Sequence, residues 1–239
     1  MKMQVYIGYD PREFDAFRVA AYTLTQTSGI IPHALDTERL RASGLYWRDV
    51  DARHGQFYDL PSQAPCSTDF ATSRFLTPII CQSGWALFTD CDVVFIDNVL
   101  DMLDEIEPSK AVYVVKHKYF VQEETKMDGQ KQTRYQRKNW SSVMLFNCDH
   151  PANRRLSLES VNRMAGRNLH QFYWLADSEI GELDPKWNWL VGVTDKPDDP
   201  GIAHFTLGGP WIDGWNQKPH DRIWTEAAEE LGFWHSKTA

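Results

Sequence analysis

Two aspartates, Asp90 and Asp92, interrupt an apolar stretch over residues 85–95 that otherwise has the pattern of a buried strand. Side chains alternate between the two faces of a strand, so residues two apart point the same way. At the carboxyl end of a strand, both carboxylates could bind one divalent ion. Carboxylate oxygens suit Mg²⁺ and Mn²⁺, and a site with few protein carboxylates leaves its other positions to water and substrate phosphates. The spacing therefore indicates either a phosphate-bearing substrate or ordinary turn chemistry at a strand end.

The elements that would position these aspartates form an alternating pattern. Apolar residues recur at helical spacing over residues 68–83, and Gly84 marks a stop before the Asp-x-Asp strand. Strands are predicted near residues 4–8, 30–35, 86–89, 93–96, 111–116 and 142–147. Helices are predicted near residues 13–27, 68–83, 99–105, 154–166 and 221–231. This order favours an α/β fold with a mostly parallel sheet and helices on both faces. Ligands of such sheets bind beyond the carboxyl ends of the strands, where Asp10 and Asp90 would emerge.

Five short motifs follow one another over roughly residues 4 to 211. They are the strand 4–8 with Tyr9-Asp10-Pro11-Arg12, the run Ser73–Pro78 with Asp90-Cys91-Asp92, and the segments 139–147, 176–188 and 204–211. In this order they resemble the GT-A glycosyltransferases, and especially glycosyltransferase family eight. That family has Ser-Arg-(apolar)-x-x-Pro before a strand that ends in Asp-x-Asp. The shared order is stronger evidence than any single motif.

The resemblance implies a single GT-A domain over residues 1–239, with a Rossmann-like α/β fold, and a site for a nucleotide-sugar donor. The implied donor-binding residues are Ile7, Tyr9, Asp10, Arg12, Arg74, Asp90, Cys91, Ser141, Ser142, Gly208, Gly209 and Trp211. Asp90, Asp92 and His204 would bind the metal. Because histidine is a poor ligand for Mg²⁺, this set favours Mn²⁺ over Mg²⁺. Asp177 and Glu179 would lie near the anomeric carbon as catalytic carboxylates, or else cap a helix or face solvent.

The chain also departs from the family pattern at four positions. Ser142 stands where the family has Gly, Ser178 where it has Gln, and Glu179 where it has Asp. The closing motif is one residue short and has Gly209 in place of a lysine that contacts phosphate. Lys218, the nearest cation downstream, is therefore predicted to neutralise the donor diphosphate.

Composition narrows the class of protein. The chain has 239 residues, 42% of them hydrophobic, which is enough for one sizeable core. A net charge of −8 argues against nucleic acid as a partner. The four cysteines, at 66, 81, 91 and 148, show no Cys-x-x-Cys spacing, so neither zinc nor disulfides are indicated. No signal-peptide pattern and no run near ~18 apolar residues occurs, so a cytoplasmic protein without a transmembrane segment is expected.

Three loop segments have a chemical character of their own. Five basic residues against one acid lie between Lys126 and Lys138, which predicts a solvated loop, a lid over a phosphorylated donor or a binding segment for an anionic acceptor. Residues 195–201 form an acidic stretch typical of a turn-rich surface loop. Trp211 and Trp215 lie in a Gly/Pro-rich loop that would be poor core material, which favours contact with carbohydrate.

The predicted reaction is transfer of a sugar from a nucleotide diphosphate sugar, in which a metal ion stabilises the departing diphosphate. The resemblance implies retention of anomeric configuration and UDP as the nucleotide, and a glycan or lipid-linked acceptor is plausible. Two other classes remain open. One is a haloacid dehalogenase-like phosphatase, whose Asp-x-Asp would use its first aspartate as nucleophile. The other is a nucleotide-sugar-binding protein without turnover, which the departures at Ser142, Ser178 and Gly209 permit.

Overall fold

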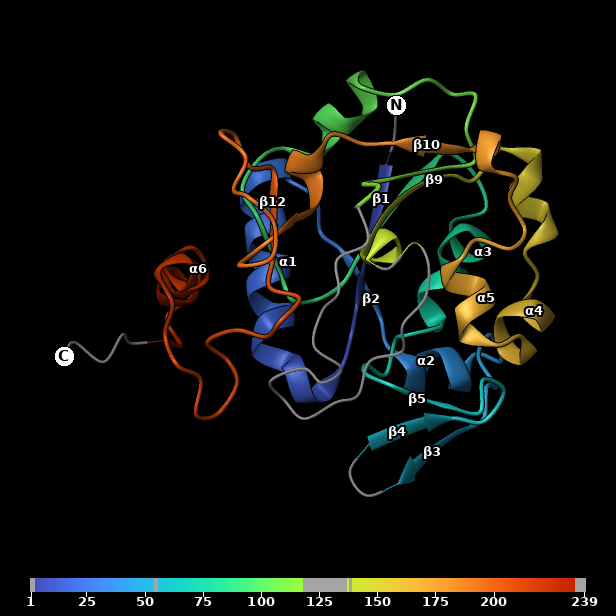
Figure 1. The fold of residues 1–239 in the computed structure, drawn as a ribbon, viewed down its shortest axis with the longest axis horizontal. Helices are drawn as coiled ribbons and strands as arrows, with labels where there is room; N and C mark the ends of the chain where they lie inside the picture. Colours follow the sequence, from blue (N-terminus) through green and yellow to red (C-terminus); the bar gives the residue numbers. More distant parts are fainter. Residues whose placement is uncertain (1–2, 54–55, 118–136, 138, 235–239) are drawn as a thin grey trace.

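The computed structural model describes residues 3–53, 56–117, 137 and 139–234. Its largest sheet has six strands in the order β10-β8-β9-β6-β1-β2 (Figure 1). These strands are β1 (Met3–Gly8), β2 (His33–Leu35), β6 (Trp85–Thr89), β8 (Val112–Val114), β9 (Val143–Asn147) and β10 (Ile180–Glu182). Only β9 runs antiparallel to its neighbours, β6 and β8. The predicted mostly parallel sheet is therefore confirmed.

Two three-stranded sheets accompany the large one. One pairs β7 (Val93–Phe95), β12 (Ile202–His204) and β11 (Trp189–Leu190). The antiparallel pairing of β12 with β7 sets His204 opposite Val93, and so brings His204 beside Asp92. The other contains β3 (Val50–Arg53), β4 (Gln56–Asp59) and β5 (Ala64–Cys66), all antiparallel. The sequence patterns predicted none of β3, β4, β5, β10, β11 and β12, which are two to four residues long.

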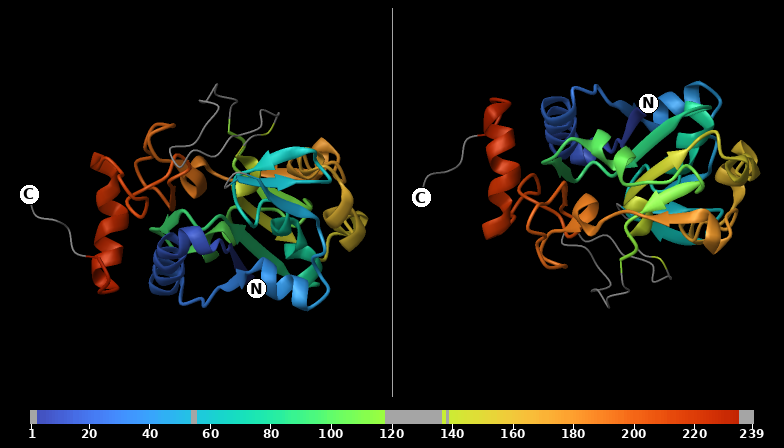
Figure 2. Two further views of the ribbon diagram at one scale, coloured as in Figure 1. Left: turned by 90° about the horizontal axis from the view of Figure 1, so that it is seen from below. Right: turned by 90° about the horizontal axis from the view of Figure 1, so that it is seen from above.

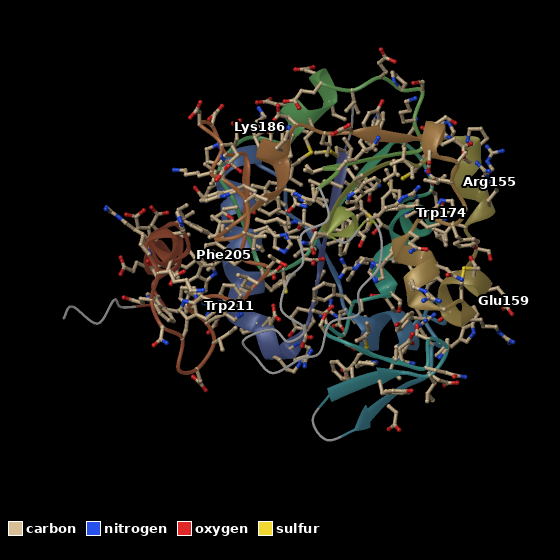
Figure 3. All side chains as sticks on the ribbon, viewed as in Figure 1. Arg155, Glu159, Trp174, Lys186, Phe205 and Trp211 are labelled. Atoms are coloured by element: carbon tan, nitrogen blue, oxygen red, sulfur yellow. The ribbon has the colours of Figure 1, made fainter. Side chains whose placement is uncertain are left out.

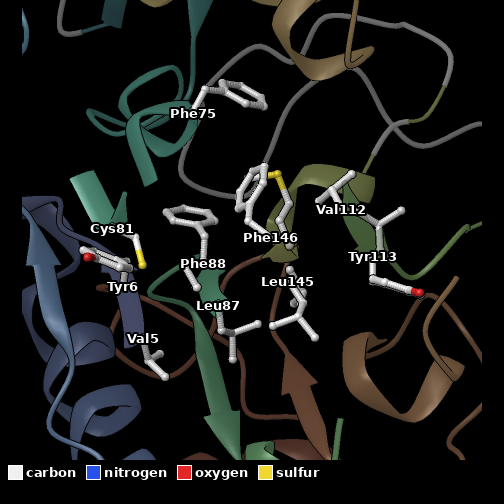
Figure 4. Close-up of a cluster of buried hydrophobic side chains, with 14 of the residues drawn as sticks. Val5, Tyr6, Phe75, Cys81, Leu87, Phe88, Val112, Tyr113, Leu145 and Phe146 are labelled. Atoms are coloured by element: carbon white, nitrogen blue, oxygen red, sulfur yellow. The ribbon is translucent and has the colours of Figure 1, made fainter. Parts of the chain in front are cut away.

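The helices are α1 (Phe14–Ser28), α2 (Thr37–Ala42), α3 (Thr77–Cys81), α4 (Leu158–Arg163), α5 (Gly166–His170) and α6 (Arg222–Glu230). The α6 helix lies beside α1 at one end of the molecule, and α4 and α5 lie at the other end (Figure 2). The prediction of helices on both faces of the sheet is confirmed by the packing of β1, β6 and β9. Their side chains alternate, with Tyr6, Phe88 and Phe146 directed toward Cys81 and Phe75, while Val5, Leu87 and Leu145 point the other way (Figure 4).

Three predicted helices are wrong in extent. The segment 68–83 is helical only from Ser73, as a 3-10 turn to Leu76 followed by α3. Pro78 explains the break, because proline lacks an N–H and is tolerated only in the first turn of a helix, where it stands in α3. The segment 99–105 is a 3-10 helix, Val99–Asp104. The segment 154–166 is divided into a 3-10 turn at Pro151–Arg155, then α4, then α5, because Met164 is extended with ψ of 148°.

Two hydrophobic clusters hold these layers together. The larger joins the central strands to the region of α3, α4 and α5. The smaller packs α6 on α1 and on the sheet of β7, β11 and β12, and Phe205 and Trp211 lie in this region between α1 and α6 (Figure 3). Within the described ranges, none of the helices has both the length and the apolar character that a membrane span requires.

Candidate metal and donor site

Asp90, Asp92 and His204 converge where three short elements end. Asp90 follows β6 directly, Asp92 precedes β7, and His204 is the last residue of β12. One ligand atom from each lies within 4.8 Å of the others, and His204 Nε2 is 3.2 Å from Asp92 Oδ1. Asp92 and His204 are buried, and Asp90 is half-buried. Two carboxylates and an imidazole at this spacing form a donor set suited to one divalent ion, as predicted from the sequence.

Asn188 fixes the orientation of the His204 ring. Its Oδ1 lies 2.9 Å from His204 Nδ1. Its Nδ2 donates to Ser142 Oγ at 3.0 Å and to the Asn139 carbonyl at 3.3 Å, so Oδ1 is the atom that accepts from the imidazole. Metal-binding histidines generally donate their second ring N–H in this way, which leaves Nε2 for the metal. Asn188 ends the segment 176–188 that resembles the family, but its contact with His204 was not predicted from the sequence.

Arg74 is paired with Asp90. Its Nη1 lies 2.7 Å from Asp90 Oδ1 and donates to the Ser141 carbonyl at 2.9 Å. The guanidinium also lies over the rings of Phe70 and Phe88, at 5.2 and 5.1 Å from their centroids. The arginine is buried, which is unusual for a charged side chain unless it is paired. Two aromatic faces and a carboxylate thus hold a cation next to the metal-binding residues.

A cavity of about 270 Å³ lies beside these groups. Its wall brings together Arg74, Asp90, Ser141, Ser142 and His204, all of which the sequence predicted as site residues. The remaining lining residues come mainly from the β4–β5 region and from α5. They are Asp59, Ser62, Ala64, Pro65, Cys66, Ser67, Ala71, Thr72, Asn139, Ala165, Gly166, Arg167, His170 and Thr206.

His170 is a cavity residue that sequence reasoning missed. Its Nδ1 lies 2.7 Å from Ser141 Oγ, and its ring meets Phe75 edge to face at 5.1 Å. Burial, together with the nearby guanidinium groups of Arg74 and Arg48, lowers the pKa of His170 well below 6.5. The imidazole is therefore neutral at pH 7. No local pattern around His170 points to the site, because the contact with Ser141 spans 29 residues and depends on how α5 packs.

The residues at the end of β1 and directly after it are held by packing and by hydrogen bonds. Ile7 is fully buried, and Tyr9 packs edge to face on Phe17 at 5.2 Å. Asp10 is 0% exposed and accepts from Arg12 Nε at 3.0 Å and Nη2 at 2.6 Å, and from the Asp69 N–H at 3.0 Å. Burial opposes the charge of Asp10, but these bonds prevail and lower the pKa of the carboxyl group. Contact of Asp10 with a nucleotide base stays a prediction.

Arg12 links this network to the cavity wall. It donates to the carbonyl of Ser67, a lining residue, at 2.9 Å. Its guanidinium lies over the Phe57 ring, 4.4 Å from the centroid. Cys91, between the two metal-binding aspartates, is fully buried, and its thiol donates to Glu13 at 3.5 Å. The side chain of Cys91 is therefore buried, and Cys91 is not among the residues that line the cavity.

Asp177 and Glu179 do not line the cavity. Asp177 is 89% exposed and pairs with Arg137. Glu179 pairs with Arg155, which lies at the outer edge of the molecule beside α4 (Figure 3). A hydrogen bond from the Ala176 N–H and the charge of Arg155 lower the pKa of Glu179. The catalytic role of the two carboxylates remains a prediction.

The closing loop lies apart from the cavity as well. The ring of Trp211 lies tilted against Trp224, with centroids 5.5 Å apart, and meets Phe205 edge to face at 6.0 Å. Trp215 donates to Asp221 at 2.7 Å. Lys218, predicted to replace the missing lysine, lies 4.4 Å over the Trp215 ring and does not line the cavity. Gly208 and Gly209 belong to the same loop. Gly208, Gly209 and Trp211, which were predicted to bind the donor, do not line the cavity.

Gly209 has a steric reason to lack a side chain. A Cβ atom at this position would overlap the six-membered ring of Trp211. The ring is itself held by Phe205 and Trp224, so the family lysine could not be accommodated without moving Trp211. The basic segment between Lys126 and Lys138 lies outside the described residues, except for Arg137.

The sheet order, the Asp-x-Asp turn and the histidine that returns beside it define the GT-A fold of glycosyltransferases. Apo GlyE of Streptococcus pneumoniae TIGR4, a glycosyltransferase, is 15% identical with a TM-score of 0.53, over 95% of this chain and 60% of that chain. The galactosyltransferase LgtC, solved with donor and acceptor sugar analogues, is 14% identical with a TM-score of 0.55, over 98% of both chains. The bifunctional glycosyltransferase WbbM is 13% identical with a TM-score of 0.57, over 95% of this chain and 49% of that chain.

This chain therefore spans less than two thirds of the GlyE and WbbM chains. At these identities the likeness establishes the GT-A fold, and it does not distinguish family eight within it. Protein CDI of Arabidopsis thaliana is 40% identical over 245 residues, which cover 99% of this chain and 90% of that protein. The chain belongs to the family of Protein CDI. A comparison with protein-family models gives no match.

Proposed function

We propose that this protein is a metal-dependent glycosyltransferase that moves a sugar from a nucleotide diphosphate sugar to a glycan or another acceptor. The observation that carries the proposal is the meeting of Asp90, Asp92 and His204 beside a cavity that also contains Arg74. The GT-A fold supports the same class of reaction. The related structure of LgtC, a galactosyltransferase solved with donor and acceptor sugar analogues, supports a sugar donor and a sugar acceptor.

The site residues have complementary tasks in this reaction. Asp90, Asp92 and His204 would hold Mn²⁺, or Mg²⁺, which supplies Lewis-acid stabilisation of the departing diphosphate. Asn188 keeps the His204 ring in position for that ligation. Arg74 adds positive charge at the same point, and its Nε has no hydrogen-bond partner among the described residues. A phosphate oxygen of the donor would accept from this group, because the planar guanidinium fork suits phosphate geometry.

The nucleotide and the stereochemistry are finer parts of the proposal. We infer UDP as the nucleotide and retention as the outcome from the sequence resemblance alone. Asp177 and Glu179 are proposed to act near the anomeric carbon only if their ion pairs with Arg137 and Arg155 open when substrate binds.

The phosphatase alternative requires Asp90 as a nucleophile. The pairing of Asp90 with Arg74 supports the proposal that Asp90 remains a charged carboxylate ligand instead.

The test is calorimetric titration with UDP, GDP and their common sugar conjugates, with and without Mn²⁺. We expect one nucleotide to bind only with the metal, and Asp92→Asn to abolish that binding. Asp213→Asn is the matched control, because Asp213 is exposed and lies outside the cavity wall. Incubation of the binding donor with glycan acceptors, followed by mass spectrometry of the products, then tests transfer. Binding without transfer or hydrolysis supports a nucleotide-sugar-binding protein, and absence of nucleotide binding in any metal overturns the donor site.

A further inference from the structure

The α5 helix presents two polar side chains to the cavity, Arg167 and His170. Arg167 and His170 are three residues apart, and side chains at this spacing lie on one face of a helix. Both line the same cavity as Asp90 and His204. The part of the cavity wall that α5 forms is called the α5 end here, and the part that Asp90 and His204 form is called the metal end.

Arg167 differs in one respect from the other charged residues of the cavity wall. Four charged side chains line it, at positions 59, 74, 90 and 167. Asp59 is paired with the buried Arg48 at 2.6 Å, and Arg74 is paired with Asp90 at 2.7 Å. Arg167 is exposed, and within the described part of the chain its side chain has neither an ion pair nor a hydrogen bond. The α5 end of the cavity thus carries one uncompensated positive charge.

The neighbours of Arg167 are suited to a polar, uncharged partner. Ser141 Oγ and His170 Nδ1 lie 2.7 Å apart on the cavity wall. His170 is neutral, since burial and the guanidinium groups of Arg74 and Arg48 lower its pKa. A hydroxyl and a neutral imidazole exchange hydrogen bonds with sugar hydroxyl groups without bringing charge to them. A guanidinium beside them binds a carboxylate or a phosphate through two parallel hydrogen bonds.

We propose that the α5 end of this cavity selects an acidic sugar, whose carboxylate or phosphate group binds Arg167 while its hydroxyl groups contact Ser141 and His170. The inference rests on the proposed glycosyltransferase function, and it adds the substrate class. The acidic sugar is either the sugar of the donor, as a nucleotide-linked uronic acid, or the acceptor. In both cases Arg167 is a specificity-determining residue. The roles proposed for Asp90, Asp92 and His204 in metal binding stay the same.

The experiment measures affinities by calorimetry in two arms. The donor arm compares UDP-glucuronate with UDP-glucose, and UDP-galacturonate with UDP-galactose, in the presence of Mn²⁺. The corresponding GDP-linked sugars are used if GDP is the nucleotide that binds. The acceptor arm compares free glucuronate and glucose 6-phosphate with glucose, both on the Mn²⁺–nucleotide complex and on the protein alone. Each arm is repeated with Arg167→Gln, Arg167→Lys and the control Arg163→Gln, which changes an exposed arginine of α4 outside the cavity wall.

We expect the acidic sugar to bind about tenfold more tightly than its neutral counterpart in one arm, the range for a charge-assisted hydrogen bond at an accessible site. Arg167→Gln should abolish this preference and leave the affinity for the nucleotide itself unchanged. Arg167→Lys should keep part of the preference, and Arg163→Gln all of it. The arm in which the preference occurs identifies the acidic sugar as donor or acceptor.

Three results would overturn the inference. One is equal affinity for acidic and neutral sugars in both arms. Another is a preference that persists in Arg167→Gln. The third is a loss of affinity for the unconjugated nucleotide in Arg167→Gln, which would make Arg167 the cation that replaces the family lysine at the diphosphate. Failure of the proposed function would give a different result, because no nucleotide would bind. The affinity of the protein alone for acidic and neutral free sugars would then still show whether Arg167 selects an acidic sugar.

Discussion

The Oδ1 atom of Asn188 lies 2.9 Å from Nδ1 of His204, and the amide nitrogen of the same asparagine donates to Ser142 Oγ at 3.0 Å. The amide therefore cannot rotate without losing both contacts, and the imidazole is held with Nε2 toward Asp92. Ser142 stands where the resembling family has glycine. Its hydroxyl is part of this network, so the departure adds a support for the orientation of the His204 ring.

Asn188→Ala should weaken Mn²⁺ binding by about tenfold or more, the usual cost of removing a group that orients a metal ligand. The His204 ring would then lose the acceptor that fixes its orientation. Titration of Mn²⁺ by electron paramagnetic resonance measures the free ion directly. Asn162→Ala is the matched control, because Asn162 is also buried and hydrogen-bonded, to the carbonyls of Leu45 and Leu158. Equal metal affinity in the two variants would contradict the role of Asn188.

Arg74→Met should destabilise the metal-free protein by about 3 kcal/mol, because Arg74 is buried and its ion pair with Asp90 at 2.7 Å is lost. Asp90 would then bind a cation without competition from the guanidinium group. Mn²⁺ should accordingly raise the free energy of unfolding of Arg74→Met more than that of the wild type. Urea denaturation with and without Mn²⁺ measures both quantities.

Arg48→Met is the comparison for this prediction. Arg48 and Asp59 form a buried pair at 2.6 Å, and neither belongs to the metal-binding group. Arg48→Met should lower the free energy of unfolding by a similar amount. Mn²⁺ should not reduce the difference in this free energy between Arg48→Met and the wild type. If Mn²⁺ stabilises wild type and Arg74→Met by the same amount, Asp90 does not contribute to metal binding.

The metal-binding group could be predicted from the sequence because its carboxylates are local. Asp90 and Asp92 are two residues apart at the end of an apolar strand, a spacing that indicates either a cation site or ordinary turn chemistry. His204 lies more than 100 residues further along the chain, and only the resemblance to a known family connected it to the aspartates. The β7–β12 pairing, which brings His204 beside Asp92, was not predicted, since it joins segments more than 100 residues apart in the chain.

The α5 side of the site could not be predicted in the same way. Residues 154–166 carry an apolar spacing that suggests one helix, but the chain turns at Met164 and starts α5 in a new direction. That turn directs Arg167 and His170 to the cavity. Conversely, Asp177 and Glu179 match a family motif in sequence, yet arginines distant in the chain pair with them outside the cavity. Tertiary packing, rather than local pattern, decides which polar residues meet.

The neutral His170 should make the stability depend on pH. Its pKa in the folded state is well below 6.5, while the unfolded chain takes up a proton near pH 6.5. Below that pH the unfolded state binds more protons, so the free energy of unfolding falls as pH falls. The stability that this group contributes is present above pH 6.5 and is lost progressively as the pH falls below that value.

His170→Gln should remove this part of the pH dependence, since glutamine can bond to Ser141 and does not titrate. Urea denaturation at a series of pH values measures the slope. His33→Gln, at an exposed position, serves as the control and should retain the steeper slope of the wild type. A wild-type slope that His170→Gln leaves unchanged between pH 7 and pH 5.5 would refute the prediction.

Gly209→Lys restores the residue that the resembling family has, and we expect it to damage the fold instead of improving the site. The new Cβ would overlap the Trp211 ring, which is packed on Phe205 and Trp224. Displacement of that ring should cost about 2 kcal/mol, within the range for overpacking. Gly209→Ala should show most of the same loss, because the clash comes from Cβ and not from the charge.

A double-mutant cycle separates the clash from other effects. Trp211→Ala loses packing on its own, but Gly209→Ala should add little in that background, since the overlapping ring is gone. Urea denaturation gives the four free energies, and calorimetry with Mn²⁺ and the nucleotide shows whether the lysine contributes charge to the site. Additive losses in the cycle, or tighter nucleotide binding by Gly209→Lys at unchanged stability, would mean that Trp211 moves freely and that this loop can serve the diphosphate after all.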